Sequence, residues 1–150
     1  MLLFIDNPKD PILENVKDDP VRPELSIEFR TSKNKFVSVL VEEKVRAMVC
    51  VSLQGVIPET VSDLTKCIED ITTAVFYTIW SYEPGAGSEL LTKTCDAIKE
   101  QYPQVERFVT LSPKTEMARK FHLKNGAKIH KENDETVNYD YTEAVLSELT

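Results

Sequence analysis

Ser112 and His122 are the two side chains in this sequence whose types and spacing suit proton transfer. A hydroxyl beside an imidazole is the minimum needed to move a proton at neutral pH. If the surrounding segment is a helix, Ala118, His122 and Asn125 share one face. If that face points to the end of the preceding strand, His122 points toward Ser112. Two other interpretations stay open: Ser112 before Pro113 is a suitable helix N-cap, and His122 is a half-buried helix residue with one hydrogen bond.

A second group of residues suits the binding of an anion. Two of the four glycines, Gly85 and Gly87, lie between an aromatic strand and a helix, and Ser88 follows them. A glycine-rich turn before a helix directs several backbone N–H groups to one point, where the helix dipole adds positive charge. This suits a pyrophosphate, as in coenzyme A or a nucleotide, with Ser88 as a cap or a ligand. The spacing matches neither the dinucleotide fingerprint nor a P-loop, and a tight turn that needs positive φ is the alternative.

Several other polar and aromatic side chains have a structural interpretation beside a functional one. Glu89, at the start of the expected helix, complements the helix dipole. Tyr82 follows an aromatic strand and either packs or lines a ligand pocket. Tyr139 and Tyr141 share one face of the last strand and are core or pocket-wall residues. His130, between charged neighbours, is expected at a solvated strand end.

The composition is that of an ordinary soluble chain and excludes several function classes. The 150 residues are 41% hydrophobic and 29% charged and carry a net charge of -7. An acidic surface repels phosphate backbones and anionic lipids, so we expect no nucleic acid and no membrane as a partner. Three separated cysteines and two histidines argue against a metal site and for the cytoplasm. No apolar stretch is long enough for a membrane helix, and the first residues are too short and too soon acidic for a signal peptide.

The first half of the chain is expected to form an irregular acidic arm followed by strands. The arm covers about residues 1–23 and contains four prolines, and a short acidic helix packed loosely on the domain is the alternative for this stretch. Alternating apolar residues at 25–29 predict a half-buried strand, and 36–41 and 45–53 predict two more in an antiparallel meander. Apolar residues at helical spacing predict a short amphipathic helix at 61–68.

The second half is expected to alternate strands and helices around the candidate residues. Strands are predicted at 74–80, 107–111, 127–130 and 137–141. Helices are predicted at 89–101 and 115–124, separated from their neighbours by the loops 81–88 and 112–114. Asn125-Gly126 is a common left-handed stop for the second helix. This order predicts one domain, residues 1–150, of the α/β or α+β class, with helices on the faces of a mixed sheet.

These motifs, in this order, resemble the GCN5-related acyltransferase (GNAT) fold. The loop from Tyr82 to Gly87 takes the place of that family's coenzyme A pyrophosphate loop. The spacing of Ala118, His122 and Gly126 resembles the second signature of the family. The sequence departs from the family at Tyr82, where the loop usually begins with Arg or Gln, and at His122, where many members have Tyr. The resemblance implies a mostly antiparallel sheet and a coenzyme A thioester, bound without a metal by Tyr82, Gly85, Ala86, Gly87 and Ser88.

A narrower resemblance is to the catalytic domain of malonyl-CoA decarboxylase, over about residues 45–141. It rests on short stretches in the same order: Ala74–Tyr77, Gly87–Leu90, Leu111–Pro113, Phe121–Ala127 and Val137–Tyr141. The resemblance implies that Ser112 and His122 are the catalytic pair and that Glu89 and Tyr139 line the same site. The decarboxylases carry an N-terminal helical domain and a long insertion before the histidine helix, where this chain has only a few residues.

The resemblances imply one function and two alternatives. The first is decarboxylation of malonyl-CoA to acetyl-CoA through an enolate, with Ser112 and His122 as the acting pair. The second is transfer of an acetyl group from acetyl-CoA to an amine, with His122 in proton transfer. The third is a non-catalytic module that binds acyl-CoA. The expected partner is an acyl-CoA substrate, and a homodimer is a possible assembly.

Overall fold

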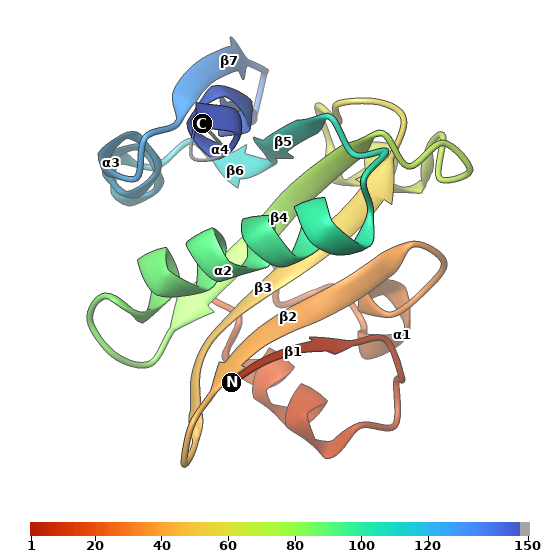
Figure 1. The fold of residues 1–150 in the computed structure, drawn as a ribbon, viewed down its shortest axis with the longest axis vertical. Helices are drawn as coiled ribbons and strands as arrows, with labels where there is room; N and C mark the ends of the chain where they lie inside the picture. The colour runs from red at the N-terminus through yellow and green to blue at the C-terminus, as the bar shows by residue number, and fades with distance from the viewer. Residues whose placement is uncertain (148–150) are drawn as a thin grey trace.

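The computed structural model describes residues 1–147 and contains one eight-stranded sheet with helices on both faces (Figure 1). The strands are β1 (Leu2–Ile5), β2 (Lys35–Val41), β3 (Val45–Gln54), β4 (Thr73–Ser81), β5 (Arg107–Thr110), β6 (Ser112–Pro113), β7 (Lys128–Glu132) and β8 (Thr136–Asp140). The α-helices are α1 (Ile27–Arg30), α2 (Ala86–Gln101), α3 (Glu116–Lys124) and α4 (Thr142–Ser147), and the 3-10 helices are η1 (Pro11–Asp18) and η2 (Val61–Thr65).

The sheet order is β1-β2-β3-β4-β5-β8-β6, and β7 pairs with β8. The β4–β5 pair is parallel, and the other pairs in the described part of the chain are antiparallel. The predicted class, a mixed and mostly antiparallel sheet flanked by helices, is confirmed. A parallel pair needs a crossover connection, and here α2 supplies it between β4 and β5.

Both faces of the central strands are buried, which explains their nearly continuous apolar sequences. One face packs against α2, whose Leu90, Leu91 and Ile98 are buried with Val49 and Phe76. The opposite face packs against the N-terminal segment; its core residues are Leu13, Val16, Val37, Met48 and Cys50. Successive residues of β2 and β3 therefore pack on opposite faces of the sheet, into two separate hydrophobic cores.

Most predicted elements occur within a few residues of their expected positions, and two have different limits. The helix predicted at 89–101 begins at Ala86 because Gly85 is its N-cap, with a left-handed φ of 81°. The helix predicted at 61–68 is only a 3-10 turn that ends at Thr65, since Cys67 has a positive φ of 54°. Gly126, with φ of 96°, ends α3 as predicted.

In the N-terminal part, one prediction is wrong and one alternative that the sequence left open is decided. Residues 25–29 do not form a strand: Ser26 caps the short helix α1 by accepting a hydrogen bond from the Phe29 backbone N–H at 3.0 Å. The neighbour of β2 in the sheet is β1 instead. Of the two alternatives for the arm, the short helix is observed at Pro11–Asp18: Asp10 caps η1, which buries Leu13 and Val16 against the sheet and so is not loosely packed. A five-residue alternation fits one helical turn as well as a strand, and here the cap decides.

Candidate active site

The candidate site lies where β4 and β5 separate. The two strands pair from Thr73 to Phe76, and the last bond between them runs from the Leu111 N–H to the Phe76 carbonyl at 2.9 Å. Beyond this point β4 continues to Ser81, while the segment that follows β5 turns away from β4, forms β6 and pairs with β8. A β-bulge leaves Tyr77 without a partner in β3, which bends β4 at the same place.

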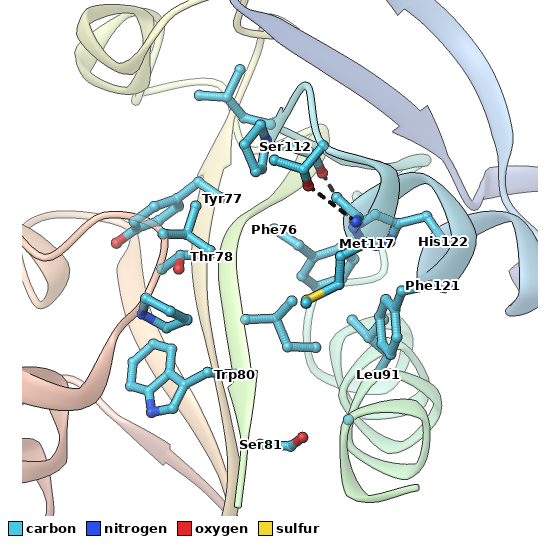
Figure 2. A pocket seen from close by; sticks show the side chains of 18 residues that line it. Phe76, Tyr77, Thr78, Trp80, Ser81, Leu91, Ser112, Met117, Phe121 and His122 are labelled. Carbon is cyan, nitrogen blue, oxygen red and sulfur yellow. Dashed lines mark hydrogen bonds between the residues drawn. The ribbon is translucent and has the colours of Figure 1, made fainter. Parts of the chain in front are cut away.

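A mostly apolar cavity of about 330 Å³ occupies this separation (Figure 2). Its walls come from β4, α2, α3 and the segment before Arg22. The lining residues are Pro20, Val21, Phe76, Tyr77, Thr78, Ile79, Trp80, Ser81, Gly87, Leu91, Leu111, Ser112, Pro113, Thr115, Met117, Ala118, Phe121 and His122. Ser112 and His122 lie at one end, and Trp80 and Ser81 lie at the other (Figure 2). Its volume is at the lower end of the range for small-molecule pockets.

Ser112 and His122 are brought together at this end of the cavity. Ser112 Oγ and His122 Nε2 are 3.2 Å apart, and both residues are buried. The alternative in which Ser112 caps the helix is wrong, because Thr115 is the N-cap of α3 and Ser112 is in β6. Strand β6 carries the Ser112 hydroxyl, and the last turn of α3 directs the His122 imidazole toward it.

The other ring nitrogen of His122 is bonded to a tyrosine. Tyr141 Oη lies 2.7 Å from His122 Nδ1, and the Tyr139 ring stacks on the imidazole with centroids 4.9 Å apart. Both tyrosines are buried. The imidazole is thus held by one hydrogen bond at each nitrogen and by an aromatic face, which fixes its orientation toward the cavity.

The hydrogen bonds define the protonation state of the site. Burial lowers the pKa of His122 to about 4, so the ring is neutral at pH 7. Burial raises the pKa of Tyr141, so its hydroxyl keeps its proton and donates to Nδ1. Ser112 Oγ donates to Thr110 Oγ1 at 2.8 Å, and it therefore accepts from the Nε2–H of His122. One directed chain runs from Tyr141 through His122 and Ser112 to Thr110.

The lowered pKa of His122 predicts a pH-dependent stability. An unfolded histidine titrates near 6.5, so between pH 6.5 and 4 the unfolded state binds more protons than the native state. The free energy of unfolding therefore falls as the pH is lowered through this window, by about 3 kcal/mol. Urea unfolding of the wild type and of His122→Gln at several pH values isolates this contribution, since other groups titrate in both proteins. Parallel curves for the two proteins would contradict the burial of a neutral imidazole.

The glycine-rich loop is placed beside the cavity by the start of α2. Gly85 has the positive φ that the tight-turn interpretation requires, while Gly87 lies inside the helix and lines the cavity. A Cβ at Gly87 would lie 3.3 Å from the Phe121 ring, so the absence of a side chain lets α2 and α3 approach closely. Ala86 is buried, and Ser88 is the third residue of the helix.

Of the nine predicted site residues, Ser112, His122 and Gly87 line this cavity, and the other six do not. Tyr139 contacts the site through the His122 ring, and Gly85, Ala86 and Ser88 flank Gly87 in the chain.

Tyr82 and Glu89 make their contacts elsewhere. Tyr82 donates a hydrogen bond from its hydroxyl to Asp18 at 2.7 Å and accepts one from the Trp80 indole at 3.2 Å. Glu89 forms ion pairs with Arg46 at 3.2 Å and with Lys93 at 2.9 Å, and these cations lower its pKa.

Arg46 also pairs with Glu42 and Glu83, so its guanidinium contacts three carboxylates. The carboxylate of Glu89 joins the surface pairs at the start of α2 and does not reach Ser112 or His122.

Sequence reasoning missed two members of the hydrogen-bonded chain. Thr110 precedes Ser112 by two residues, and alternation along an extended chain places their side chains on one side. Tyr141 shares a face with Tyr139, yet the pattern does not tell which of the two hydroxyls reaches the imidazole. That choice depends on the turn from β8 into α4, where the Tyr141 N–H bonds the Phe108 carbonyl at 2.8 Å.

Within residues 1–147, no group of three or more His, Cys, Asp or Glu side chains is arranged to hold a metal ion. Over the same residues, no helix has both the length and the apolar composition to cross a membrane.

The comparisons with known proteins give a structural match only. No protein-family model matches the sequence, and no curated protein matches it significantly. Solved structures do match. Malonyl-CoA decarboxylase from Rhodopseudomonas palustris is 19% identical with a TM-score of 0.74, covering all of this chain and 63% of that one. The Agrobacterium vitis decarboxylase is 23% identical with a TM-score of 0.66, covering 81% of this chain and 35% of that one.

An acetyltransferase fold of the same size matches along its full length. Tetrahymena GCN5 is 15% identical with a TM-score of 0.62, and the match covers 95% of this chain and 97% of that one. This chain thus spans less than two thirds of the decarboxylases but nearly all of the acetyltransferase. At such low identities the matches establish architecture, and together with the sheet order they identify it: the chain has the GNAT fold.

Proposed function

We propose that the cavity binds the acyl end of a coenzyme A thioester and that Ser112 and His122 decarboxylate a malonyl group there. The observation that carries the proposal is the directed chain Tyr141–His122–Ser112 at one end of an apolar cavity. An apolar site destabilises the malonate carboxylate relative to the neutral carbon dioxide that leaves it. The similarity to malonyl-CoA decarboxylases supports this choice of acyl group.

The reaction needs no electron acceptor beyond the thioester. The bond between the α-carbon and the free carboxylate breaks, its electron pair moves into the thioester to form an enolate, and carbon dioxide leaves. One proton is taken up from solvent and ends on the α-carbon, giving the acetyl thioester. Ser112 donates that proton, with the carbon replacing Thr110 as its acceptor. His122 orients Ser112, restores its proton and stabilises the enolate, and such stabilisation is worth about 3–4 kcal/mol.

The remainder of coenzyme A is assigned to the start of α2. Gly87 lines the cavity, and Gly85, Ala86 and Ser88 are its neighbours at the helix N-terminus. The Ala86 N–H bonds the Glu83 carbonyl at 3.3 Å, so the N–H groups of Gly87 and Ser88 are the donors that we propose for the pyrophosphate. With the acyl group inside the cavity, the N-terminus of α2 would remain available to bind the pyrophosphate. Tyr82 would contribute from the start of the loop, where its hydroxyl is held by Asp18.

Acyl transfer to an amine is the second candidate, because the match to an acetyltransferase covers nearly the whole length of both chains. A neutral His122 could take a proton through water from the substrate ammonium, which frees the nitrogen lone pair to attack the thioester carbonyl. Both reactions start from a coenzyme A thioester, but only acyl transfer needs a second substrate, the amine. If the protein binds coenzyme A but converts no thioester, the third alternative applies, a non-catalytic module that binds acyl-CoA.

Incubation of the protein with malonyl-CoA, followed by mass spectrometry of the coenzyme A thioesters, tests the proposal. We expect acetyl-CoA and carbon dioxide in equal amounts, with no dependence on added amines. Release of free coenzyme A from acetyl-CoA only with an amine library present would instead select acyl transfer. Thermal stabilisation by coenzyme A with no product from either thioester would exclude both reactions.

A further inference from the structure

A buried arginine bridges the two strands where their ladder ends. Arg22 is only 9% exposed. Its Nε donates to the Tyr77 carbonyl at 3.0 Å, and its Nη2 donates to the Leu111 carbonyl at 3.1 Å. Tyr77 is the bulge residue of β4, and Leu111 follows β5. One guanidinium therefore takes the place of backbone pairing at the point where β4 and β5 separate.

The segment that carries Arg22 borders two hollows of different character. The preceding residues, Pro20 and Val21, line the apolar cavity. Arg22 itself lines a second hollow of about 700 Å³, whose other walls include Lys131 and Asn133. The second hollow, called the polar hollow below, is more polar than the cavity, since its lining includes Glu59, Lys131 and Glu132. Pro113 is shared by the two, and Arg22 lies on the side of the polar hollow.

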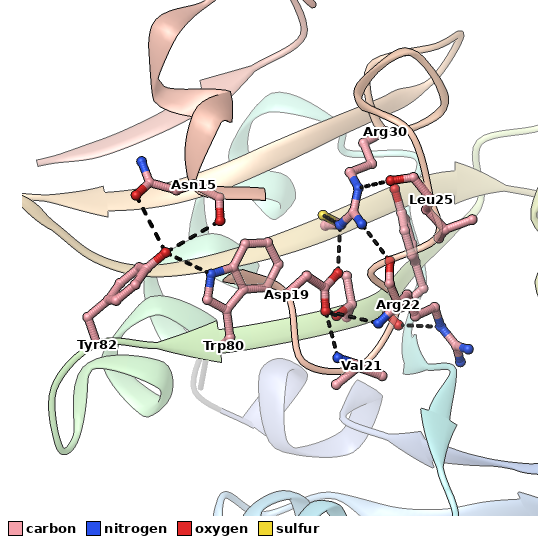
Figure 3. A network of polar contacts seen from close by, with 11 residues as sticks. Asn15, Asp19, Val21, Arg22, Leu25, Arg30, Trp80 and Tyr82 are labelled. Carbon is pink, nitrogen blue, oxygen red and sulfur yellow. Dashed lines mark hydrogen bonds and ion pairs between the residues drawn. The ribbon is translucent and has the colours of Figure 1, made fainter. Parts of the chain in front are cut away.

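The segment that carries Arg22 is fixed in place by buried charge (Figure 3). Asp19 accepts hydrogen bonds from the backbone N–H groups of Val21 at 2.8 Å and Arg22 at 3.0 Å, which closes a tight turn. Its second carboxylate oxygen accepts from Arg30 at 2.7 Å, and Arg30 also donates to the Arg22 carbonyl at 2.6 Å. The backbone of Arg22 is thereby held at its N–H and its carbonyl, and the guanidinium is held separately by its two bonds to the Tyr77 and Leu111 carbonyls.

We propose that Arg22 closes the rear of the cavity and makes it a site for one substrate, by blocking water and amines from reaching the thioester through the polar hollow. The proposal deepens the proposed function, on which it rests for a thioester in the cavity. Two of the donors of Arg22 occupy the carbonyls that a second substrate would meet between β4 and β5. Decarboxylation needs no second substrate, whereas hydrolysis and acyl transfer do.

Hydroxylamine is a suitable small probe for this barrier. Its nitrogen attacks the thioester carbonyl carbon, the carbon–sulfur bond breaks, and a proton from nitrogen ends on the sulfur. The products are a hydroxamate and free coenzyme A. The measurement is the rate of hydroxamate formation from acetyl-CoA, with protein in excess so that the thioester is bound, compared with the rate for free acetyl-CoA.

We expect the wild type to slow hydroxamate formation at least tenfold relative to free acetyl-CoA. In Arg22→Ala and Arg22→Gln that protection should be lost while acetyl-CoA still binds. Lys131→Ala changes the wall of the polar hollow without opening the barrier, and it should protect like the wild type. With malonyl-CoA, the ratio of hydroxamate to acetyl-CoA should rise in both Arg22 variants, once the hydroxamate formed by the same concentration of free malonyl-CoA is subtracted and the variants are shown to be folded by circular dichroism.

The outcomes separate this inference from the proposed function. A wild type that binds acetyl-CoA without protecting it, or folded Arg22 variants that protect it fully, would overturn the barrier. If neither Arg22→Ala nor Arg22→Gln folds, Arg22→Lys, which keeps the charge but cannot bond both carbonyls through a planar guanidinium, takes their place and should lose the protection. Protection of acetyl-CoA together with no acetyl-CoA from malonyl-CoA would refute decarboxylation and leave the barrier in place.

Discussion

Ser112→Ala is expected to lower kcat for malonyl-CoA decarboxylation by about 10²–10⁴-fold, the range for loss of a positioned proton donor. The variant removes the hydroxyl that lies 3.2 Å from His122 Nε2 and leaves the apolar cavity otherwise intact. His122→Gln should have an effect of similar size, because the two residues act as one unit, and the double variant should be little worse than either single variant. Initial rates of acetyl-CoA formation at saturating substrate measure these changes.

Ser38→Ala is the matched control for this prediction. Ser38 is also a fully buried serine whose hydroxyl bonds a threonine, Thr94, at 2.8 Å, but it lies between β2 and α2. We expect a similar loss of stability and an unchanged kcat. Activity of Ser112→Ala or His122→Gln at the wild-type level would show that the pair is structural and that decarboxylation does not proceed through it.

Asp19→Ala is expected to destabilise the protein by about 3–5 kcal/mol, since it leaves the charge of Arg30 buried without its partner. Both side chains of this ion pair are fully buried, 2.7 Å apart. Asp19 Oδ1 also accepts from the Thr78 hydroxyl at 2.8 Å, so the substitution removes support from β4 as well. The free energy of unfolding in urea at pH 7 measures the loss.

Glu143→Gln serves as the comparison. Its ion pair with Lys128 is about equally short, at 2.6 Å, but both side chains are about 70% exposed or more. Such pairs contribute roughly 0–1 kcal/mol. A loss below 1 kcal/mol for Asp19→Ala would mean that Arg30 finds another partner or water in the variant, and that the N-terminal segment is not held by this charge.

The sequence was sufficient for the elements whose signals are local. The run of β-branched and aromatic residues at 74–80 predicted β4, and Asn125-Gly126 predicted the end of α3, because strand propensity and a left-handed stop act over a few residues. The approach of Ser112 to His122 was predictable for a related reason: only ten residues separate them, and one strand–turn–helix unit positions both.

The region around Arg22 could not be predicted in the same way. Arg30 and Asp19 resemble solvated surface charges in the sequence, and their burial depends on partners in distant strands. Arg30 even donates to the Cys50 thiol of β3 at 3.4 Å, and burial raises the pKa of that thiol to about 11. Local patterns carry no information about such pairings, so the sequence alone predicts a strand at residues 25–29 and leaves the preceding arm open between irregular structure and a short helix.

The two bonds of Arg22 have a consequence for the order in which the protein forms. They link Arg22 to Tyr77, which lies 55 positions later in the chain, and to Leu111, which lies 89 positions later. Both are long-range contacts. Loop closure over such distances comes late, after the entropy of the intervening chain has been lost. During synthesis the N-terminal segment leaves the ribosome first, yet it finds its place only when β4 and β5 exist. During refolding of a complete chain, Ser112 and His122, ten residues apart, would therefore come together before Arg22 reaches its two carbonyls.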